Sequence, residues 1–426
     1  MIKNNNKSIS SVYDGATVIG KIYKGIVRLY ESWRKLITSG IPPLSIYSKG
    51  EELIDYKIEG NRVQDGTPTP DTPVEIESVG DKTDNLFDND INGAFVKKDG
   101  NDLVLNNYSC STGMKPSEFL AMTGLKVGDK FTIKRSFTIE KGTGNNVTGA
   151  MRFLKSSSGN WQLISGSQSI NTVTIPADFN DENYTYLYVY GAITKDENGE
   201  LLTRFKKVQI AKGSYTNSTM PKYEPYGYRI PVKVSGIDVE PFSTNIYLKE
   251  PLRKIDEYFD YIDFEKGKVY RKIYNEFFEK VTSTSSEVTT YKKFITNISK
   301  KPLLKSTNPN SSNAGDMMGY AISNKFMQSK VNYNNLGKYP NLIQSYITTS
   351  GGNRVACTFD DSSIITVAQA NEKLGDGFDV CYVLEKEITE TVELPNISTH
   401  KGTTVIEVDT SITPSNMEVT YYGKGV

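Results

Sequence analysis

Residues 58–88 constrain the fold of this chain more than any other stretch. Pro68, Pro70 and Pro73 lie close together there in a Thr-Pro alternation. Proline lacks a backbone N–H and has a fixed φ, so the segment cannot be helical and follows an extended path. The alternating run that follows, residues 74–80, predicts a strand with one apolar face. We therefore expect a rigid connection between two β modules.

Size and charge narrow the classes of function. The chain has 426 residues, which is enough for about two to four domains with cores of their own. Lysine plus arginine equal aspartate plus glutamate, 50 against 50, so the formal net charge is zero. Nucleic acid and anionic membranes favour a basic surplus, and no apolar run approaches the roughly 18 residues of a membrane span. The sequence predicts neither nucleic-acid binding nor membrane insertion, and its N-terminus lacks the apolar core of a secretion signal.

Cysteine and histidine are scarce. Cys110, Cys357 and Cys381 are widely spaced and no CxxC occurs, so neither a disulfide framework nor a zinc site is expected. His400 is the single histidine, and any catalytic site that needs an imidazole would have to use it. It lies in a polar turn and is interpreted as an ordinary surface residue. The sequence therefore favours a non-enzymatic protein.

Tyrosine dominates the aromatic residues, with 27 Tyr against 17 Phe and 2 Trp. Tyr, Thr and Val favour strands, whereas Asn and Gly favour turns. We predict an all-β chain with few short helices, in which two jelly-roll-like sandwiches are carried on a β platform. The predicted parts are a small N-terminal hairpin module (1–40), the platform with its Pro-rich elbow (41–84), the first sandwich (85–220), the platform continued (221–274), and a second sandwich with a closing C-terminal hairpin (275–426).

Two helices carry explicit end signals. Residues 117–123 are followed by Gly124, a typical C-terminal stop. Thr366 and Gln369 have the spacing of a capping box, and Gly375 follows the apolar residues of that segment.

A second Pro/Gly/Tyr elbow occupies residues 221–227. The run after it, residues 229–236, repeats the order of proline, alternating strand and glycine seen in residues 73–80. This echo predicts that the first sandwich is inserted into the platform, which resumes at Tyr228. The first elbow would then fix how that sandwich is held out from the platform.

The segments that frame the two interiors resemble a family of tail and baseplate structural proteins in phages of Gram-positive, chiefly clostridial, bacteria. They read IEGNRVQDGTPTPDTPVEIESVGD with the following NLFD, YEPYGYRIPVKVSG, TNIYLKEPLRKIDEYFDYIDFEKGKVYRKI and ELPNISTHKGTTVIEVDTSITPSNMEVTYYG. The resemblance implies a virion component at the host-facing end of the tail, made in the host cytoplasm. It implies several copies per particle or a homo-oligomer, variable interiors that resemble carbohydrate-binding jelly rolls, and no catalytic residues. We expect residues 1–40 to attach to other virion proteins. The resemblance does not specify a ligand, and host cell-wall polysaccharide is the candidate.

One strand carries a candidate glycan site. Tyr184, Tyr186, Tyr188 and Tyr190 alternate with Thr and aliphatic residues, so strand periodicity predicts all four on one face. Tyrosine rings stack on sugar rings and their hydroxyls form hydrogen bonds. Trp161, in a Ser/Gly loop, is a candidate stacking partner. The alternative is that these aromatics pack against another sheet or a neighbouring chain.

A candidate calcium loop begins at Asp88. Asp88, Asp90 and Asn92 precede a glycine in the order that opens an EF-hand loop, and Asp99 stands at the twelfth position. The twelfth residue is Asp rather than Glu, and neither flank is a convincing helix. An ordinary Asp/Asn turn explains the same residues, so no cofactor is required and calcium is the one candidate.

Three functions remain open. The first is a non-enzymatic tail or baseplate protein that presents its sandwiches to host glycan. The second is a glycan hydrolase that uses paired carboxylates, for which Asp360 with Asp361, or Asp376 with Asp379, would serve. The third is a structural spacer whose sandwiches contact only neighbouring subunits.

Overall fold

The computed structural model covers most of the chain beyond residue 52. Its backbone is described for residues 2–4, 7–9, 13–14, 17–18, 21–24, 27–31, 34–39, 44–49, 53–64, 66–88, 91, 93–145, 148–155, 161–165, 169–236, 239–287, 289–306, 316–348, 350–397 and 401–421. Side chains are described for the same residues from 56 onward, except 161–165, 239, 401–403 and 419–421. His400 lies outside these ranges.

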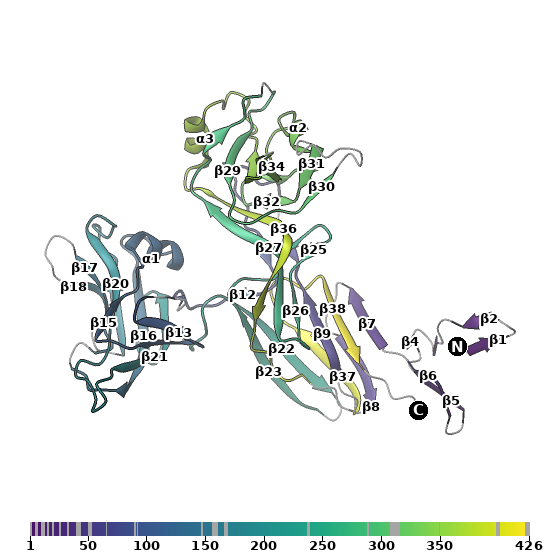
Figure 1. Cartoon of the computed structure of the whole chain (residues 1–426), viewed down its shortest axis with the longest axis horizontal. Coiled ribbons are helices and arrows are strands. Elements are labelled where there is room, and N and C mark those ends of the chain that lie inside the picture. The colour runs from purple at the N-terminus through teal and green to yellow at the C-terminus, as the bar shows by residue number, and fades with distance from the viewer. Residues whose placement is uncertain are drawn as a thin grey trace. The chain divides into compact units, whose positions relative to one another are not determined.

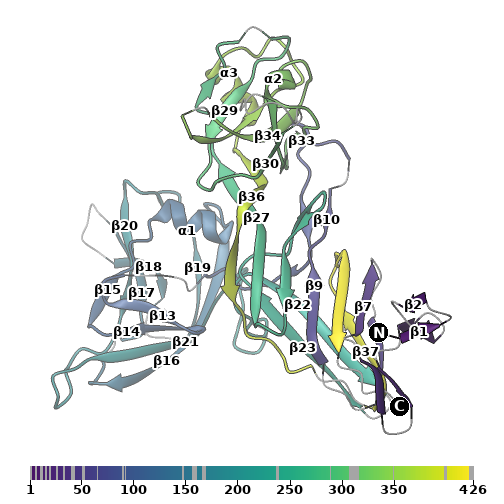
Figure 2. The same cartoon turned by 45° about the vertical axis from the view of Figure 1, so that its right-hand side comes forward.

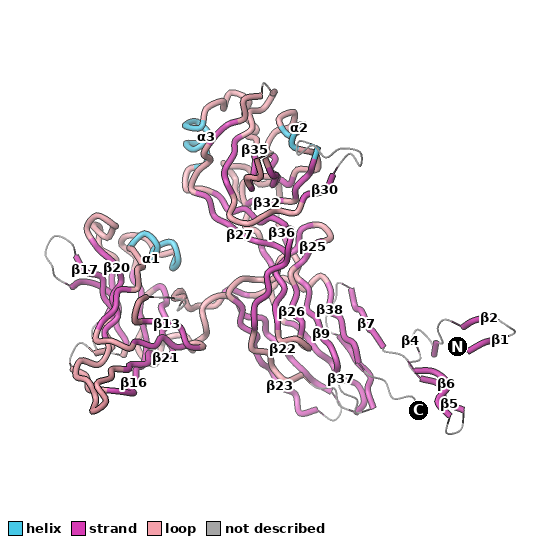
Figure 3. Tube along the Cα trace, viewed as in Figure 1, coloured by secondary structure: helices cyan, strands magenta, loops and turns pink. Residues whose placement is uncertain are grey.

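The chain is all-β, as predicted: strands dominate, with three short helices among the described residues (Figure 3). It divides into two compact units. The inserted unit comprises residues 82–229, and the frame unit comprises residues 1–81 and 230–426. The first sandwich was predicted at 85–220, within the inserted unit. None of the described helices is long and apolar enough to cross a membrane.

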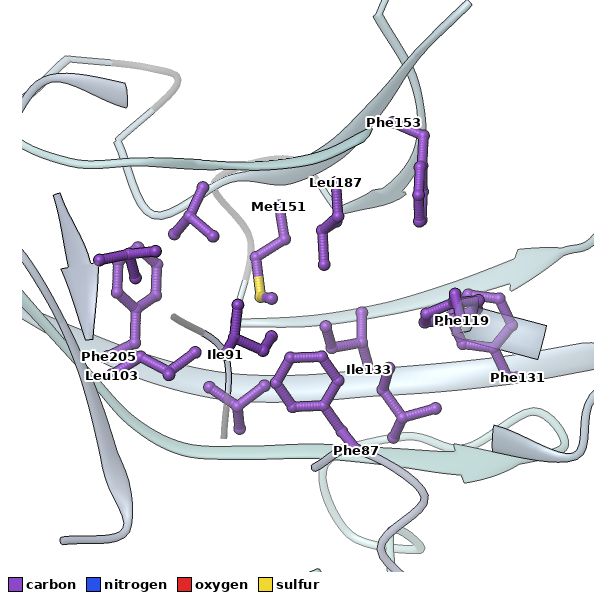
Figure 4. Packing of buried hydrophobic residues seen from close by; sticks show 14 of the residues in the cluster. Phe87, Ile91, Leu103, Phe119, Phe131, Ile133, Met151, Phe153, Leu187 and Phe205 are labelled. Atoms are coloured by element: carbon purple, nitrogen blue, oxygen red, sulfur yellow. The ribbon is translucent and has the colours of Figure 1, made fainter. Parts of the chain in front are cut away.

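Two antiparallel sheets build the inserted unit (Figure 1). The first runs β13(Val96–Asp99), β14(Asp102–Leu105), β21(Leu202–Lys212), β16(Lys130–Lys141), β19(Ile170–Thr174), and the second runs β15(Ser109–Ser111), β20(Tyr184–Tyr190), β17(Met151–Lys155), β18(Trp161–Ser165). Figure 4 shows side chains from both sheets meeting in one core, among them Phe131, Phe205, Phe153 and Leu187. The jelly-roll connectivity stays a prediction.

Helix α1 (Pro116–Thr123) closes one side of this core. Phe119 is fully buried and meets Phe153 edge to face, with ring centroids 5.6 Å apart. Gly124 ends the helix in the left-handed conformation with φ of 66°, so the predicted helix and its stop signal are confirmed.

The frame unit also has two sheets around a core. One runs β32(Ala321–Ser323), β36(Phe378–Thr391), β27(Lys268–Phe278), β26(Tyr261–Asp263), β9(Leu53–Glu59), β38(Asn416–Tyr421), β7(Arg34–Ser39), and the other runs β12(Asp81–Lys82), β22(Tyr228–Gly236), β37(Lys401–Val408), β8(Leu44–Lys49), with β23(Val239–Leu248) also on β22. Ile58 and Ile262 from the first sheet are buried in one cluster with Val232 and Ile406 from the second.

The C-terminal strands differ from the prediction. We expected residues 403–408 and 417–422 to close on each other as a hairpin. In the structure β37 pairs with β22 and β8, whereas β38 pairs with β9 and β7 in the other sheet. The C-terminus therefore completes both frame sheets, and the predicted hairpin is wrong.

The frame carries a second inserted part, residues 279–377, which we call the hairpin-tip module. Strands β27 and β36 pair from Lys268 with Thr391 to Phe278 with Phe378, and the module joins their far ends (Figure 2). It contains the sheet β28(Ser283–Thr284), β29(Phe294–Asn297), β35(Asn353–Cys357), β34(Leu342–Ile347), β33(Met327–Gln328), the pair β30(Leu304–Ser306) and β31(Met317–Gly319), and helices α2(Tyr333–Leu336) and α3(Val367–Leu374).

Helix α3 forms as its sequence signals predict. The Thr366 hydroxyl accepts a hydrogen bond from the N–H of Gln369, and the Gln369 side chain accepts one from the N–H of Thr366. Gly375 follows the last helical residue. Helix α2 had not been predicted.

The Pro-rich elbow packs along the hairpin-tip module. Pro68 and Pro70 are buried, and the Pro68 carbonyl accepts a hydrogen bond from the Asn341 amide at 2.5 Å. The N–H of Val74 donates to the Asn324 carbonyl at 2.8 Å. Residues 74–80 do not form the predicted continuous strand. Within them only Glu77–Ser78 (β11) is a strand, paired with β10 (Arg62–Val63), and Val79 forms a single bridge to Leu252.

The N-terminal residues form short antiparallel pairs: β1(Ile2–Asn4) with β2(Lys7–Ile9), β3(Tyr13–Asp14) with β4(Thr17–Val18), and β5(Lys21–Lys24) with β6(Val27–Glu31). Strand β7 follows them but pairs with β38 in the frame sheet. The predicted boundary at residue 40 therefore assigns one frame strand to the N-terminal module.

Candidate functional site

The predicted four-tyrosine face is wrong for Tyr184. On β20, Leu187 pairs with Phe153 and Tyr184 pairs with Lys155, so two residues, Thr185 and Tyr186, stand opposite one on β17. Such a bulge reverses the alternation of side chains beyond it. Tyr184 therefore points into the core, where it is 1% exposed.

Tyr190 lies on the outer face of β20 but is only 6% exposed. Its ring meets that of Tyr108 edge to face, with centroids 5.7 Å apart. The Arg152 guanidinium lies 5.9 Å from the Tyr190 ring centroid. Burial raises the pKa of the Tyr190 phenol. Because its ring is packed against Tyr108 and Arg152, Tyr190 does not offer that ring to a ligand.

Tyr186 and Tyr188 remain as the outer tyrosines. Tyr186 is 41% exposed and Tyr188 is half-buried. Tyr188 pairs across the sheet with Ser111 on one side and Arg152 on the other. The structure thus keeps two of the four predicted tyrosines on the outer face of β20 with part of their surface exposed, beside Arg152 and Leu154 of β17.

Trp161 is not in a loop. It is the first residue of β18, and its backbone pairs with Leu154 of β17. Its side chain lies outside the described residues, so its predicted stacking role stays a prediction.

The calcium prediction is only partly covered by the structure. Asp90 and Asn92 lie outside the described residues. Asp99 is exposed and faces Arg204, with its Oδ2 atom 2.7 Å from the Arg204 Nη1 atom. Asp88 precedes Ile91, which is buried in the core. No group of three or more potential metal-binding side chains occurs among the described residues.

The acidic pairs considered for hydrolysis have local contacts. Hydrogen bonding from the Ser363 side chain, and from the Ser363 N–H at 2.8 Å, lowers the pKa of the Asp361 carboxyl group. Asp379 lies in β36, and burial raises its pKa.

A pocket of about 390 Å³ lies in the inserted unit, where β14 ends and β21 begins. Its volume falls in the range of small-ligand sites. The lining side chains share no single segment of sequence: Phe95, Asn106, Asn107, Lys141, Lys195, Glu200, Leu201 and Leu202, with Gly199.

Backbone hydrogen bonds fix the walls of this pocket. The Phe95 carbonyl accepts from the N–H of Asn106 at 3.0 Å. Opposite the asparagines, the Gly191 N–H donates to the Tyr108 carbonyl at 2.7 Å. A side chain at Gly191 would place its Cβ 2.7 Å from the Asn107 carbonyl oxygen, so only glycine lets the two segments approach this closely.

The loop that completes the pocket is held by Asp196. Its carboxylate accepts hydrogen bonds from the N–H groups of Asn198 at 3.0 Å and Glu200 at 2.8 Å. Its own N–H donates to the Glu200 carbonyl at 3.0 Å. Asp196 therefore sets the position from which Lys195 and Glu200 face the pocket.

Polar groups in the pocket are available to a ligand. Asn107 uses its Oδ1 atom to accept from the N–H of Tyr108 at 2.8 Å, which leaves its amide N–H groups unused among the described residues. The side chains of Asn106 and Lys195 likewise form no hydrogen bond within the described residues. Lys141 pairs with Glu200, and this contact raises the pKa of the Lys141 ammonium group.

Phe95 adds an apolar surface to this polar setting. Its side chain is 48% exposed, although phenylalanine is usually buried. An aromatic ring beside amides that can both donate and accept suits a ligand with apolar faces and hydroxyl edges. That description fits a sugar.

Sequence reasoning missed this pocket because its residues come from four separate segments. Phe95 carried the only local signal, as an aromatic residue in the turn-like stretch before β13.

Comparisons with protein-family models, with curated proteins and with solved structures found no match for this chain.

Proposed function

We propose that this chain is a non-enzymatic structural component of a phage tail or baseplate, and that its inserted unit binds host cell-surface glycan. The observation that carries the proposal is the half-exposed Phe95 ring in a pocket with the Asn106 amide and the Asn107 amide N–H groups, for which the described residues provide no hydrogen-bond partner. The resemblance of the framing segments to tail and baseplate proteins supports a place in a phage particle. Residues 1–40 are proposed to attach the chain to other proteins of that particle.

The binding mode follows from these groups. The apolar face of a sugar ring stacks on Phe95, and its hydroxyls exchange hydrogen bonds with the asparagine amides. The Lys141–Glu200 pair offers a further donor and acceptor at the wall. A shallow site of this kind binds weakly, on the order of millimolar, and many copies on one particle multiply weak contacts into firm attachment.

Co-sedimentation tests the proposal. The full-length protein is mixed with insoluble cell walls of a clostridial host and with the same walls stripped of polysaccharide. The protein is expected to sediment with intact walls and to stay in solution with stripped walls. Equal sedimentation with both preparations, or with neither, contradicts glycan binding.

Two matched variants locate the site. Phe95→Ala removes the stacking surface and is expected to reduce sedimentation. Val127→Ala also removes an exposed apolar side chain, since Val127 is 51% exposed. Val127 lies just before Lys130, the first residue of β16. The pocket residue Lys141 is the last residue of β16, about 36 Å from Lys130 at 3.3 Å per residue. Val127→Ala should bind like the unaltered protein.

A further inference from the structure

We infer that the sugar bound in the Phe95 pocket is N-acetylated, with an acetamido group in place of one ring hydroxyl. This inference rests on the proposed function and adds the chemical class of the sugar. It assigns the amide N–H groups of Asn107 to the acetamido carbonyl, and Leu201 with Leu202 to the acetyl methyl group.

The apolar lining of the pocket exceeds what a simple hexose can cover. A hexose has an apolar face of ring C–H groups, which the half-exposed Phe95 ring matches. Leu201 and Leu202 also line the pocket, and both are only partly buried. A ligand whose edges carry only hydroxyls would set polar groups against these leucines, and polar groups that leave water without a partner cost free energy. A methyl group at the edge of the sugar ring removes this conflict.

The fold fixes this apolar part of the wall. Leu202 pairs with Lys141 between strands β21 and β16. Gly142 follows Lys141, and a Cβ atom on Gly142 would lie 2.9 Å from the Cδ2 atom of Leu201. Glycine at this position therefore lets Leu201 lie close to the end of β16, beside Leu202.

The two asparagines supply the polar groups that an amide ligand needs. The Oδ1 atom of Asn107 already accepts from the N–H of Tyr108 at 2.8 Å, so its side chain meets a ligand chiefly through its N–H donors. The Asn106 amide, which also lines the pocket, has both a donor and an acceptor. An acetamido group presents a carbonyl and an N–H on adjacent atoms, with a methyl group beyond them. It therefore matches the asparagines and the leucines together, whereas a hydroxyl matches only the asparagines.

Saturation-transfer NMR with single sugars tests the inference. The full-length protein is mixed in turn with N-acetylglucosamine, N-acetylgalactosamine, glucose and galactose. The acetyl methyl signal is expected to receive the strongest saturation. Each N-acetylated sugar should bind about tenfold more tightly than its parent hexose, which is the discrimination that a small apolar group gives in a fitted pocket.

Two matched variants identify the donor. Asn107→Asp keeps the Oδ1 acceptor for the Tyr108 N–H but removes the amide donors, so it should bind N-acetylated sugars about tenfold more weakly. Asn180→Asp makes the same chemical change outside the pocket. Asn180 is exposed, and its Oδ1 atom accepts from the N–H groups of Glu182 at 3.1 Å and Asn183 at 2.9 Å. This variant should bind like the unaltered protein.

Three results would overturn the inference while sugar binding by the pocket stands. They are equal affinity for the parent hexoses, unchanged affinity in Asn107→Asp, and binding of the wall polysaccharide without binding of either N-acetylated sugar. If neither the polysaccharide nor any single sugar binds, the proposed function itself fails.

Discussion

The ring of Tyr108 lies edge to face against the ring of Tyr190, with centroids 5.7 Å apart and planes at 76°. Tyr108 follows the two asparagines of the pocket, and Tyr190 ends the strand that carries the outer tyrosines. This contact therefore ties the segment that carries the two asparagines of the pocket to the end of β20.

Tyr108→Ala tests that contact. Loss of the ring pair should lower the free energy of unfolding of the inserted unit by about 1.5 kcal/mol and should also weaken glycan binding. Tyr108→Phe keeps the ring and should behave like the unaltered protein in both respects. Denaturant titration followed by circular dichroism measures the first effect. A Tyr108→Ala variant of unchanged stability would show that the contact contributes nothing.

Asp260 stabilises an irregularity in the frame. The ladder between β27 and β36 is interrupted between Arg271 and Ile273. The fully buried Asp260 carboxylate accepts hydrogen bonds there, from the N–H groups of Lys272 at 2.8 Å and Ile273 at 2.9 Å. Its Oδ2 atom is 3.6 Å from the Arg271 guanidinium.

Asp260→Ala leaves three backbone N–H groups, those of Arg253, Lys272 and Ile273, and the buried Arg271 guanidinium without this acceptor. The free energy of unfolding of the frame unit should fall by about 3 to 5 kcal/mol. Asp409→Ala is the control, because Asp409 pairs with Lys233 at the surface, and it should change stability by less than about 1 kcal/mol. Denaturant titration compares the variants, and similar losses for both would contradict the role of Asp260.

The three cysteines should be inert in the folded protein. Cys110, Cys357 and Cys381 are all buried. Burial raises the pKa of Cys357 and raises the pKa of Cys381 to about 11. Since the thiolate is the reactive form, iodoacetamide at neutral pH should modify none of them until a denaturant is added. Mass spectrometry after a timed reaction counts the modified thiols, and rapid labelling without denaturant would contradict this burial.

Acid should weaken the inserted unit through Asp129. The Lys212 ammonium donates to its carboxylate at 2.8 Å and the N–H of Lys126 donates to the same oxygen at 2.8 Å, and together they hold the pKa of Asp129 below its usual 3.8. A carboxyl group with a lowered pKa in the folded state stabilises the protein above 3.8, and this contribution is lost as the pH falls through the folded-state pKa.

Asp129→Asn should therefore lower the melting temperature at pH 6 and have progressively less effect as the pH approaches 2. Thermal unfolding across this range measures the difference between the two proteins. A difference that stays constant with pH would contradict the ionic contribution of Asp129.

The elbow should be protected by the hairpin-tip module. Asn341 adopts φ of 51° and donates to the Pro68 carbonyl. Asn341→Gly accepts this φ but loses the hydrogen bond. Limited proteolysis should then cut residues 66–74 faster than in the unaltered protein, with other sites unchanged. An unchanged cleavage pattern would show that the prolines alone hold the elbow.

Local signals in the sequence predicted local structure well. Thr366, Gln369 and Gly375 specified α3 because a capping box and a glycine stop act over a single helix. The all-β class followed from the strand-forming composition in the same way. The tyrosine face failed at Tyr184 because a bulge depends on the partner strand, which alternation in one strand cannot indicate.

Long-range packing accounts for what the sequence could not indicate. Pro68 was expected in an extended segment, but the chain turns between Thr69 and Thr72, whose N–H groups each donate to the other's carbonyl. The contact of Pro68 with Asn341 joins residues 273 positions apart. The pocket likewise brings Phe95 beside Lys195 and Glu200, which only the folded sheets place together.

Calorimetric titration of solubilised clostridial cell-wall polysaccharide into the full-length protein tests the central claim most directly. The unaltered protein and Val127→Ala should bind with equal affinity, and Phe95→Ala should bind about tenfold more weakly. Equal binding by all three proteins, or no heat of binding from any of them, would contradict a glycan site in the Phe95 pocket.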